Sequence, residues 1–156
     1  MKFIEIRRNS DGLFLNPEKY LEQLSSLGAA LPSGAWDFAS DPGHYDFRGA
    51  RCVKDLNLKD VSHTGENEVT ISFGPNQFKH DEGLFIVYVD VSRIDFRIDG
   101  QGYFYDGFSP VVLDEVLPTE SGCSHEIALI NGSMLIECAD LRARWLALSD
   151  HNASDT

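Results

Sequence analysis

Basic residues are scarce in this sequence. Its 156 residues include 13 Lys or Arg against 25 Asp or Glu, for a net charge of −12. Between Ile98 and Leu141, a run of 44 residues contains no Lys or Arg at all, but it contains eight carboxylates. Nucleic acids and anionic membrane surfaces attract proteins that display clustered basic residues. The composition therefore argues against direct binding to either.

Cysteines and long apolar runs are also scarce. The three cysteines, Cys52, Cys123 and Cys138, are odd in number and have no CxxC spacing, which argues against a disulfide framework and a structural zinc site. The opening residues, MKFIEIRRNS, lack the apolar run of a signal peptide. No stretch approaches the roughly 20 apolar residues of a membrane helix. We therefore expect a cytoplasmic protein.

Common catalytic signatures are missing as well. The sequence has no Gly-rich phosphate loop, Rossmann fingerprint or HExxH motif, and Gly107-Phe-Ser109-Pro is not a nucleophile elbow. Asp99-Gly-Gln-Gly lacks the second and third ligands of a calcium loop. We expect neither a metal nor a cofactor. One enzymatic alternative remains, a small hydrolase or metal-dependent enzyme that uses His44, His80 or His125 with nearby acids. It requires at least two of these histidines in one pocket.

The hydrophobic pattern predicts a single α+β domain over residues 1–148, mainly antiparallel sheet, with a frayed tail over 149–156. Asn16-Pro17 is a helix start, and an apolar stripe follows at helical spacing, so one helix is expected at about 17–28. Residues 32–52 are rich in Pro and Gly and are expected to be irregular. Their aromatic residues either cover the core or form a recognition surface, and they are Trp36, Phe38, Tyr45 and Phe47.

The remaining pattern predicts strands. The expected segments are residues 2–8, the alternation around Leu56 and Leu58, residues 69–73, residues 84–98, residues 103–108 and residues 111–117. From Leu84 to Ile98 the apolar positions change from odd to even numbers, and a period of two cannot change phase in a regular strand. We predict a bulge or bend near Ser92-Arg93, where the strand crosses to another packing surface. Residues 141–148 fit a short helix or a last strand.

The clearest strand pair is a hairpin over residues 125–138, because Asn131-Gly132 is a strong signal for a two-residue type I′ turn. That turn places Glu126 opposite Glu137. The buried face of the hairpin would then consist of Ile127, Leu129, Met134 and Ile136. Like charges that face each other destabilise a strand pair. Either Glu126 and Glu137 are only solvated, or they await a cation such as a partner's Lys or Arg.

The segment SPVVLDEVLPTESGCSHEIALINGSMLIECADL, at residues 109–141, ends in this acidic hairpin. This small, acidic, β-rich chain with one early helix, and this segment most of all, resembles the immunity proteins of bacterial polymorphic-toxin and contact-dependent-inhibition systems. The resemblance implies an inhibitor that binds a cognate toxin, often a basic nuclease, and blocks its active site.

We expect the carboxylates of the base-free stretch to form a rigid surface that meets a basic protein partner such as a toxin nuclease. Aromatic side chains would supply apolar anchors. The expected contact residues are Glu126, Glu137, Asp140, Glu120, Asp114, Glu115, Asp106, Tyr103 and Tyr105. Two alternatives stay open, the enzyme described above and a non-catalytic assembly subunit whose acids only confer solubility.

Overall fold

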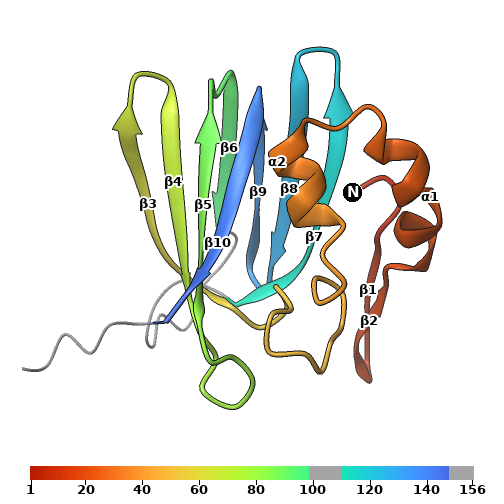
Figure 1. The fold of residues 1–156 in the computed structure, drawn as a ribbon. Coiled ribbons are helices and arrows are strands. Elements are labelled where there is room, and N and C mark those ends of the chain that lie inside the picture. The colour runs from red at the N-terminus through yellow and green to blue at the C-terminus, as the bar shows by residue number, and fades with distance from the viewer. Residues whose placement is uncertain (99–109, 148–156) are drawn as a thin grey trace, which may run out of the picture.

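The computed structural model describes residues 1–98 and 110–147. Within these ranges the chain is α+β and mostly antiparallel sheet, with two helices and ten strands (Figure 1). The elements are β1 (Glu5–Asn9), β2 (Gly12–Asn16), α1 (Glu18–Gly28), α2 (Ser33–Ala39), β3 (Asn57–Gly65), β4 (Glu68–Gly74), β5 (Gly83–Val89), β6 (Arg93–Ile98), β7 (Val111–Thr119), β8 (Gly122–Leu129), β9 (Gly132–Cys138) and β10 (Asp140–Leu146). The predicted strand at 103–108, with the expected contact residues Tyr103, Tyr105 and Asp106, lies outside the described residues, as does the predicted tail at 149–156.

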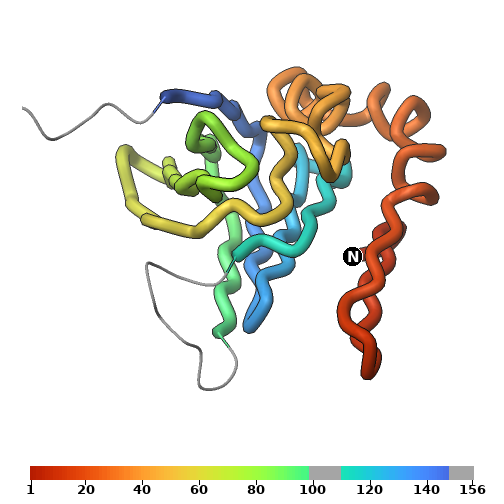
Figure 2. The backbone as a smooth tube through the Cα atoms, turned by 90° about the horizontal axis from the view of Figure 1, so that it is seen from below, coloured from red at the N-terminus to blue at the C-terminus, as the bar shows by residue number. Residues whose placement is uncertain are grey.

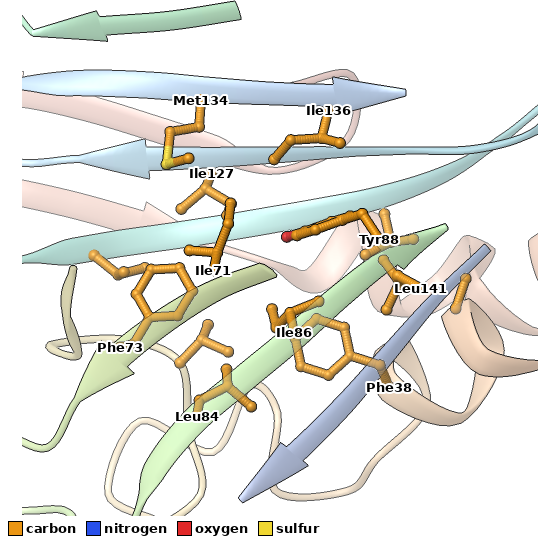
Figure 3. Packing of buried hydrophobic residues seen from close by; sticks show 14 of the residues in the cluster. Phe38, Ile71, Phe73, Leu84, Ile86, Tyr88, Ile127, Met134, Ile136 and Leu141 are labelled. Atoms are coloured by element: carbon orange, nitrogen blue, oxygen red, sulfur yellow. The ribbon is translucent and has the colours of Figure 1, made fainter. Parts of the chain in front are cut away.

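Two four-stranded sheets pack face to face. The first, here called the β5 sheet, has the order β10-β5-β4-β3, and the second, the β8 sheet, has the order β6-β9-β8-β7. Figure 2 looks along the strands and shows the two layers, with the β1–β2 hairpin and α1 to one side. Apolar side chains from both layers fill the space between them (Figure 3), among them Ile71, Ile86, Tyr88, Ile127, Met134 and Ile136.

The chain crosses from one sheet to the other between β5 and β6, so the predicted break is confirmed. β5 ends at Val89, and β6 begins at Arg93 in the β8 sheet. Asp90 lies between them with a φ of 51°, in the left-handed region that Asp tolerates better than most residues. The face assigned to the first half was wrong, because the even-numbered residues Leu84, Ile86 and Tyr88 point inward and are buried. The odd-numbered apolar residues of β5 lie on the half-buried outer face.

Helix α2 closes one side of the sandwich, in a region predicted to be irregular. It packs against β10 and β7, the edge strands of the two sheets. Pro32 precedes its first turn. Proline is suited to this position because an N–H there would have no hydrogen-bond partner within the helix. The aromatic residues of this region cover the core: Phe38 and Trp36 pack on the main cluster, and Tyr45 and Phe47 pack on a smaller second cluster.

Strand β7 is buried on both faces from Val111 to Val116, including the carboxylates Asp114 and Glu115. Val111 and Val116 face the space between the sheets, whereas Leu113 packs with Ile4 and Tyr20 in the second cluster. Helix α1 packs against this outer side, and the Tyr20 hydroxyl donates to the carbonyl oxygen of Val116 at 2.7 Å. The helix occupies 18–28, against the expected 17–28. The preceding Asn16 accepts a hydrogen bond from the Glu18 N–H at 2.9 Å.

The register of the β8–β9 hairpin differs from the predicted one by two residues. Glu126 lies opposite Leu135, and Leu129 lies opposite Gly132, so the two-residue turn is Ile130-Asn131. No residue of that turn has a positive φ, which excludes the predicted type I′ turn. A shift of two keeps each side chain on its face, so the predicted apolar face is buried. The sequence beyond Asp140 continues as a strand, β10, rather than a helix.

Candidate functional site

Asp114, on β7, lies at the centre of a buried polar network. Its Oδ1 accepts a hydrogen bond from Nε2 of His44 at 2.7 Å, and its Oδ2 accepts one from Nε2 of His125 at 2.8 Å. His44 comes from the loop after α2 and His125 from β8, so three segments meet here. The Tyr88 hydroxyl lies 2.7 Å from Nδ1 of His125. Asp114 and both histidines are at most 2% exposed.

The hydrogen bonds determine the charge of His44. Its Nδ1 lies 2.9 Å from the carbonyl oxygen of Phe38, and its Nε2 faces a carboxylate oxygen. Both partners are acceptors only, so both ring nitrogens must carry hydrogen and the ring is an imidazolium. Burial by itself lowers the pKa of His44, but the charge of Asp114 and the hydrogen bonds outweigh burial and raise it. Asp114 and His44 therefore form a buried ion pair.

The pKa of Asp114 is set by the same balance. Burial raises the pKa of its carboxyl group, but the charge of His44 and the hydrogen bonds from both histidines hold it well below the usual 3.8. His125 needs no charge in this arrangement, since the Tyr88 hydroxyl can donate to its Nδ1. Asp114 thus stays ionised inside the protein. Its predicted place on the contact surface is wrong, because β7 turns this side chain inward.

The network is closed to solvent. The internal cavity beside Asp114 and His125 has a volume of about 10 Å³ and is otherwise lined by apolar side chains. This is about the space that one water molecule needs. His44 and His125 do converge, as the enzymatic alternative requires, but a cavity of this size admits no substrate. His80 lies apart, with Nε2 2.8 Å from the carbonyl oxygen of Cys52.

Glu115 is the second predicted contact residue that lies inside the protein. It is 1% exposed, and its carboxylate accepts three main-chain hydrogen bonds, from Lys2 at 2.5 Å, Phe3 at 2.6 Å and Ile4 at 2.8 Å. These bonds hold the N-terminal segment against the outer face of β7. The prediction that Glu115 faces a partner is therefore wrong, because the chain itself covers this carboxylate.

Two carboxylates do face each other across a strand pair, but they are Glu115 and Glu126 on β7 and β8. The amino group of Met1 lies 2.6 Å from Glu126 Oε2. The N-terminal segment therefore supplies hydrogen-bond donors to one carboxylate and a cationic group to the other. That arrangement offsets the like-charge repulsion. The cation that the sequence suggested for an acidic pair is supplied by the same chain.

Asp140 caps α2 from a distant part of the sequence. Its Oδ1 accepts the N–H of Ala35 at 2.9 Å, and its Oδ2 accepts the N–H of Gly34 at 3.2 Å. Pro32, at the N-cap position, makes no side-chain capping bond. An acidic group is favourable there because it satisfies free N–H groups and complements the helix dipole. Asp140 therefore has a structural role that the sequence did not reveal.

Glu120, Glu126 and Glu137 remain on the surface. Glu120 lies in the exposed turn between β7 and β8. The side chains of Glu126 and Glu137 are 38% and 37% exposed, and Glu137 lies 3.7 Å from Arg93. They share what we call the β8–β9 outer face, made of Ser124, Glu126, Ala128, Ser133, Leu135 and Glu137. The helices pack mainly on β7 and β10, and the N-terminal segment reaches this face at Glu126, so its residues are half-buried.

The site that sequence reasoning missed is the Asp114 network. His44 is 70 residues and His125 11 residues from Asp114, so no local motif links them. Among residues 1–98 and 110–147, no group of three His, Cys, Asp or Glu side chains is arranged to hold a metal ion. In the same ranges, neither helix has the length and apolar character needed to cross a membrane.

Comparison with protein-family models, with curated proteins and with solved structures finds no match to this chain.

Proposed function

We propose that this protein is a cytoplasmic inhibitor of the immunity type, which binds a basic protein partner such as a toxin nuclease and blocks its active site. The observation that supports this proposal best is the half-buried β8–β9 outer face, which carries two partly exposed carboxylates. Glu126 and Glu137 are diagonal neighbours on it, at a separation of about 7–8 Å for such positions. A rigid strand pair holds both side chains 38% and 37% exposed, so a partner's Lys or Arg can compete with the Met1 amino group for Glu126 and with Arg93 for Glu137.

The chemistry of inhibition would be substitution of one anion for another. A nuclease binds phosphate with Lys and Arg, and carboxylates on a fixed sheet face can occupy the same groups. Arg93 beside Glu137 presents little obstacle, because exposed ion pairs contribute only about 0–1 kcal/mol. Leu135, half-buried and adjacent to both acids, offers an apolar centre for the contact, and Ala128 extends it on the far side of Glu126.

The enzymatic alternative has one observation in its favour, the convergence of His44 and His125 on Asp114. Against it, the three side chains are buried beside a cavity of about 10 Å³, and their hydrogen-bonding atoms are already paired. A catalytic group must reach the reacting atoms of a substrate. We therefore assign the network to stability and the outer face to binding.

The proposal is tested by capture of basic proteins from a lysate of the source organism at low salt, followed by assays on the purified partner. We expect a basic protein whose catalytic activity is abolished at a one-to-one ratio. Its association rate should fall by about tenfold or more as salt rises and screens the charges. A partner that is bound but keeps its activity, or a rate that ignores ionic strength, would contradict the proposal.

A pair of double variants locates the contact. Glu126→Gln with Glu137→Gln removes two charges from the outer face, and Glu66→Gln with Asp81→Asn removes two exposed charges elsewhere. We expect the first pair to slow association with the partner about tenfold and the control pair to slow it less than about threefold. Equal effects would show that only net charge matters and would remove the outer face from the interface.

A further inference from the structure

Cys123 and Cys138 lie directly opposite each other on β8 and β9. Their sulfur atoms are 3.7 Å apart, and both side chains are buried. Directly paired residues in an antiparallel sheet have Cα atoms about 4.5–5.5 Å apart, within the roughly 4.4–6.8 Å that a disulfide spans. The backbone thus already has the separation that a disulfide needs, and only the sulfur atoms must move.

We propose that Cys123 and Cys138 are a dithiol site that is converted reversibly to an intramolecular disulfide by a small-molecule disulfide. One protein thiolate attacks the small disulfide, forms a mixed disulfide and releases one small thiol. The other protein thiol then attacks the mixed disulfide, closes the Cys123–Cys138 bond and releases the second small thiol. In total the protein loses two protons and two electrons, the equivalent of two hydrogen atoms, and the small disulfide gains them.

The position of the pair in the sheet allows this reaction. Cys123↔Cys138 is the last pair of the β8–β9 ladder at this end, and ladder ends open more readily than centres. Gly122, next to Cys123, has a φ of 153°, and a Cβ there would lie 2.1 Å from the carbonyl oxygen of Cys138. Glycine therefore lets strands β8 and β9 approach each other closely at this point, which keeps the two sulfur atoms in contact.

The two sulfur atoms also differ in character. The hydrogen bond between them raises the pKa of Cys123 and lowers that of Cys138. Either thiol can make the first attack, because the second step closes the same Cys123–Cys138 bond. The third thiol provides an internal control: Cys52 is also buried, and burial raises its pKa. Oxidation of the folded protein should leave the Cys52 thiol reduced.

The test treats the folded protein with excess 2-hydroxyethyl disulfide, followed by alkylation of free thiols in denaturant and intact-mass and peptide-mass measurement. Wild type and Cys52→Ser should each lose two alkylatable thiols and the mass of two hydrogen atoms, with restoration by dithiothreitol. Cys123→Ser and Cys138→Ser should form no intramolecular disulfide. The bond closes a loop with a sequence separation of 15 residues, so Tm should rise by roughly 6–12 °C.

Three results would overturn the proposal. They are retention of all three thiols by folded wild type under excess oxidant, a disulfide that includes Cys52, and a Cys123–Cys138 bond that forms only in denaturant. Folding of each serine variant is checked by circular dichroism, and Cys52→Ser reports on the pair even where a serine at position 123 or 138 disturbs the core. The readout requires no binding partner, so its outcome is separate from that of the proposed inhibition.

Discussion

Replacement of Asp114 by asparagine is expected to destabilise the protein by about 3–5 kcal/mol at pH 6. The change keeps the shape of the side chain but removes its charge. It leaves the His44 imidazolium buried without a counterion, and it replaces one carboxylate oxygen with an NH₂ group that faces a ring N–H. Two charge-assisted hydrogen bonds, at 2.7 and 2.8 Å, are lost or weakened.

The magnitude follows from these contacts. Hydrogen bonds to charged groups contribute about 1.5–3 kcal/mol each, and removal of one partner from a buried ion pair costs about 3–5 kcal/mol. The two figures describe the same contacts and are not added. Domains of this kind are stable by about 5–15 kcal/mol, so the variant retains only part of the stability. The expected decrease in Tm is roughly 6–20 °C.

The assay is urea unfolding followed by tryptophan fluorescence and circular dichroism, with Glu120→Gln as the control. That control removes the same charge from an exposed turn and should change the unfolding free energy by less than about 0.5 kcal/mol. The double variant Asp114→Asn with His44→Gln should cost less than the sum of the two single variants, because the groups share one interaction. A loss of less than about 1 kcal/mol for Asp114→Asn, or strict additivity, would refute the ion-pair assignment.

Three further predictions concern His44, Glu115 and Asp140. The folded pKa of His44 is raised above 6.5, so the contribution of the His44 charge to folding stability is fully present below pH 6.5 and is lost as pH rises through the raised value. The stability difference between wild type and His44→Gln, measured by urea unfolding, should therefore shrink from pH 5 to pH 9. A difference that stays constant over this range would contradict the prediction. Glu115→Gln should lower the unfolding free energy by about 1–3 kcal/mol. It should also speed amide hydrogen exchange at Lys2, Phe3 and Ile4, whose N–H groups donate to the native carboxylate. Unchanged exchange at these amides would exclude the anchoring role. Asp140→Ala should cost about 1–2 kcal/mol through the lost cap of α2, which thermal unfolding measures, whereas an unchanged Tm would show that the helix needs no acid from β10.

The features that sequence predicted well are those that local periodicity determines. Alternation predicted the core face of β8 and β9, and the change of phase predicted a break before β6. The break was located correctly even though the inward face of β5 was not. Both odd and even positions of β5 are apolar, and a strand with two apolar faces gives no sign of which one lies inward.

The features that sequence did not predict depend on distant contacts. Helix α2 begins in a segment rich in Pro and Gly, and the acid that caps it is 106 residues from Gly34. Gly132 suggested a turn with positive φ, but its function is close approach: a Cβ there would lie 2.1 Å from the carbonyl oxygen of Arg97 on β6. A structural need for glycine at position 132 was therefore inferred correctly, but the need comes from the close approach of β6 and not from the turn.

The positions of the acidic residues limit how much they can contribute to binding affinity. Of the six expected contact acids that the structure describes, Asp114, Glu115 and Asp140 stabilise the fold, and Glu120, Glu126 and Glu137 remain at the surface. Exposed ion pairs contribute about 0–1 kcal/mol each, whereas nanomolar affinity needs about 12 kcal/mol. Three glutamates therefore cannot supply the affinity of a tight inhibitor. Their role in such a complex would be to speed encounter, and slow dissociation would have to come from apolar contacts such as Leu135 at the centre of the face. Salt should accordingly change the association rate much more than the dissociation rate, while truncation of Leu135 to alanine should do the reverse.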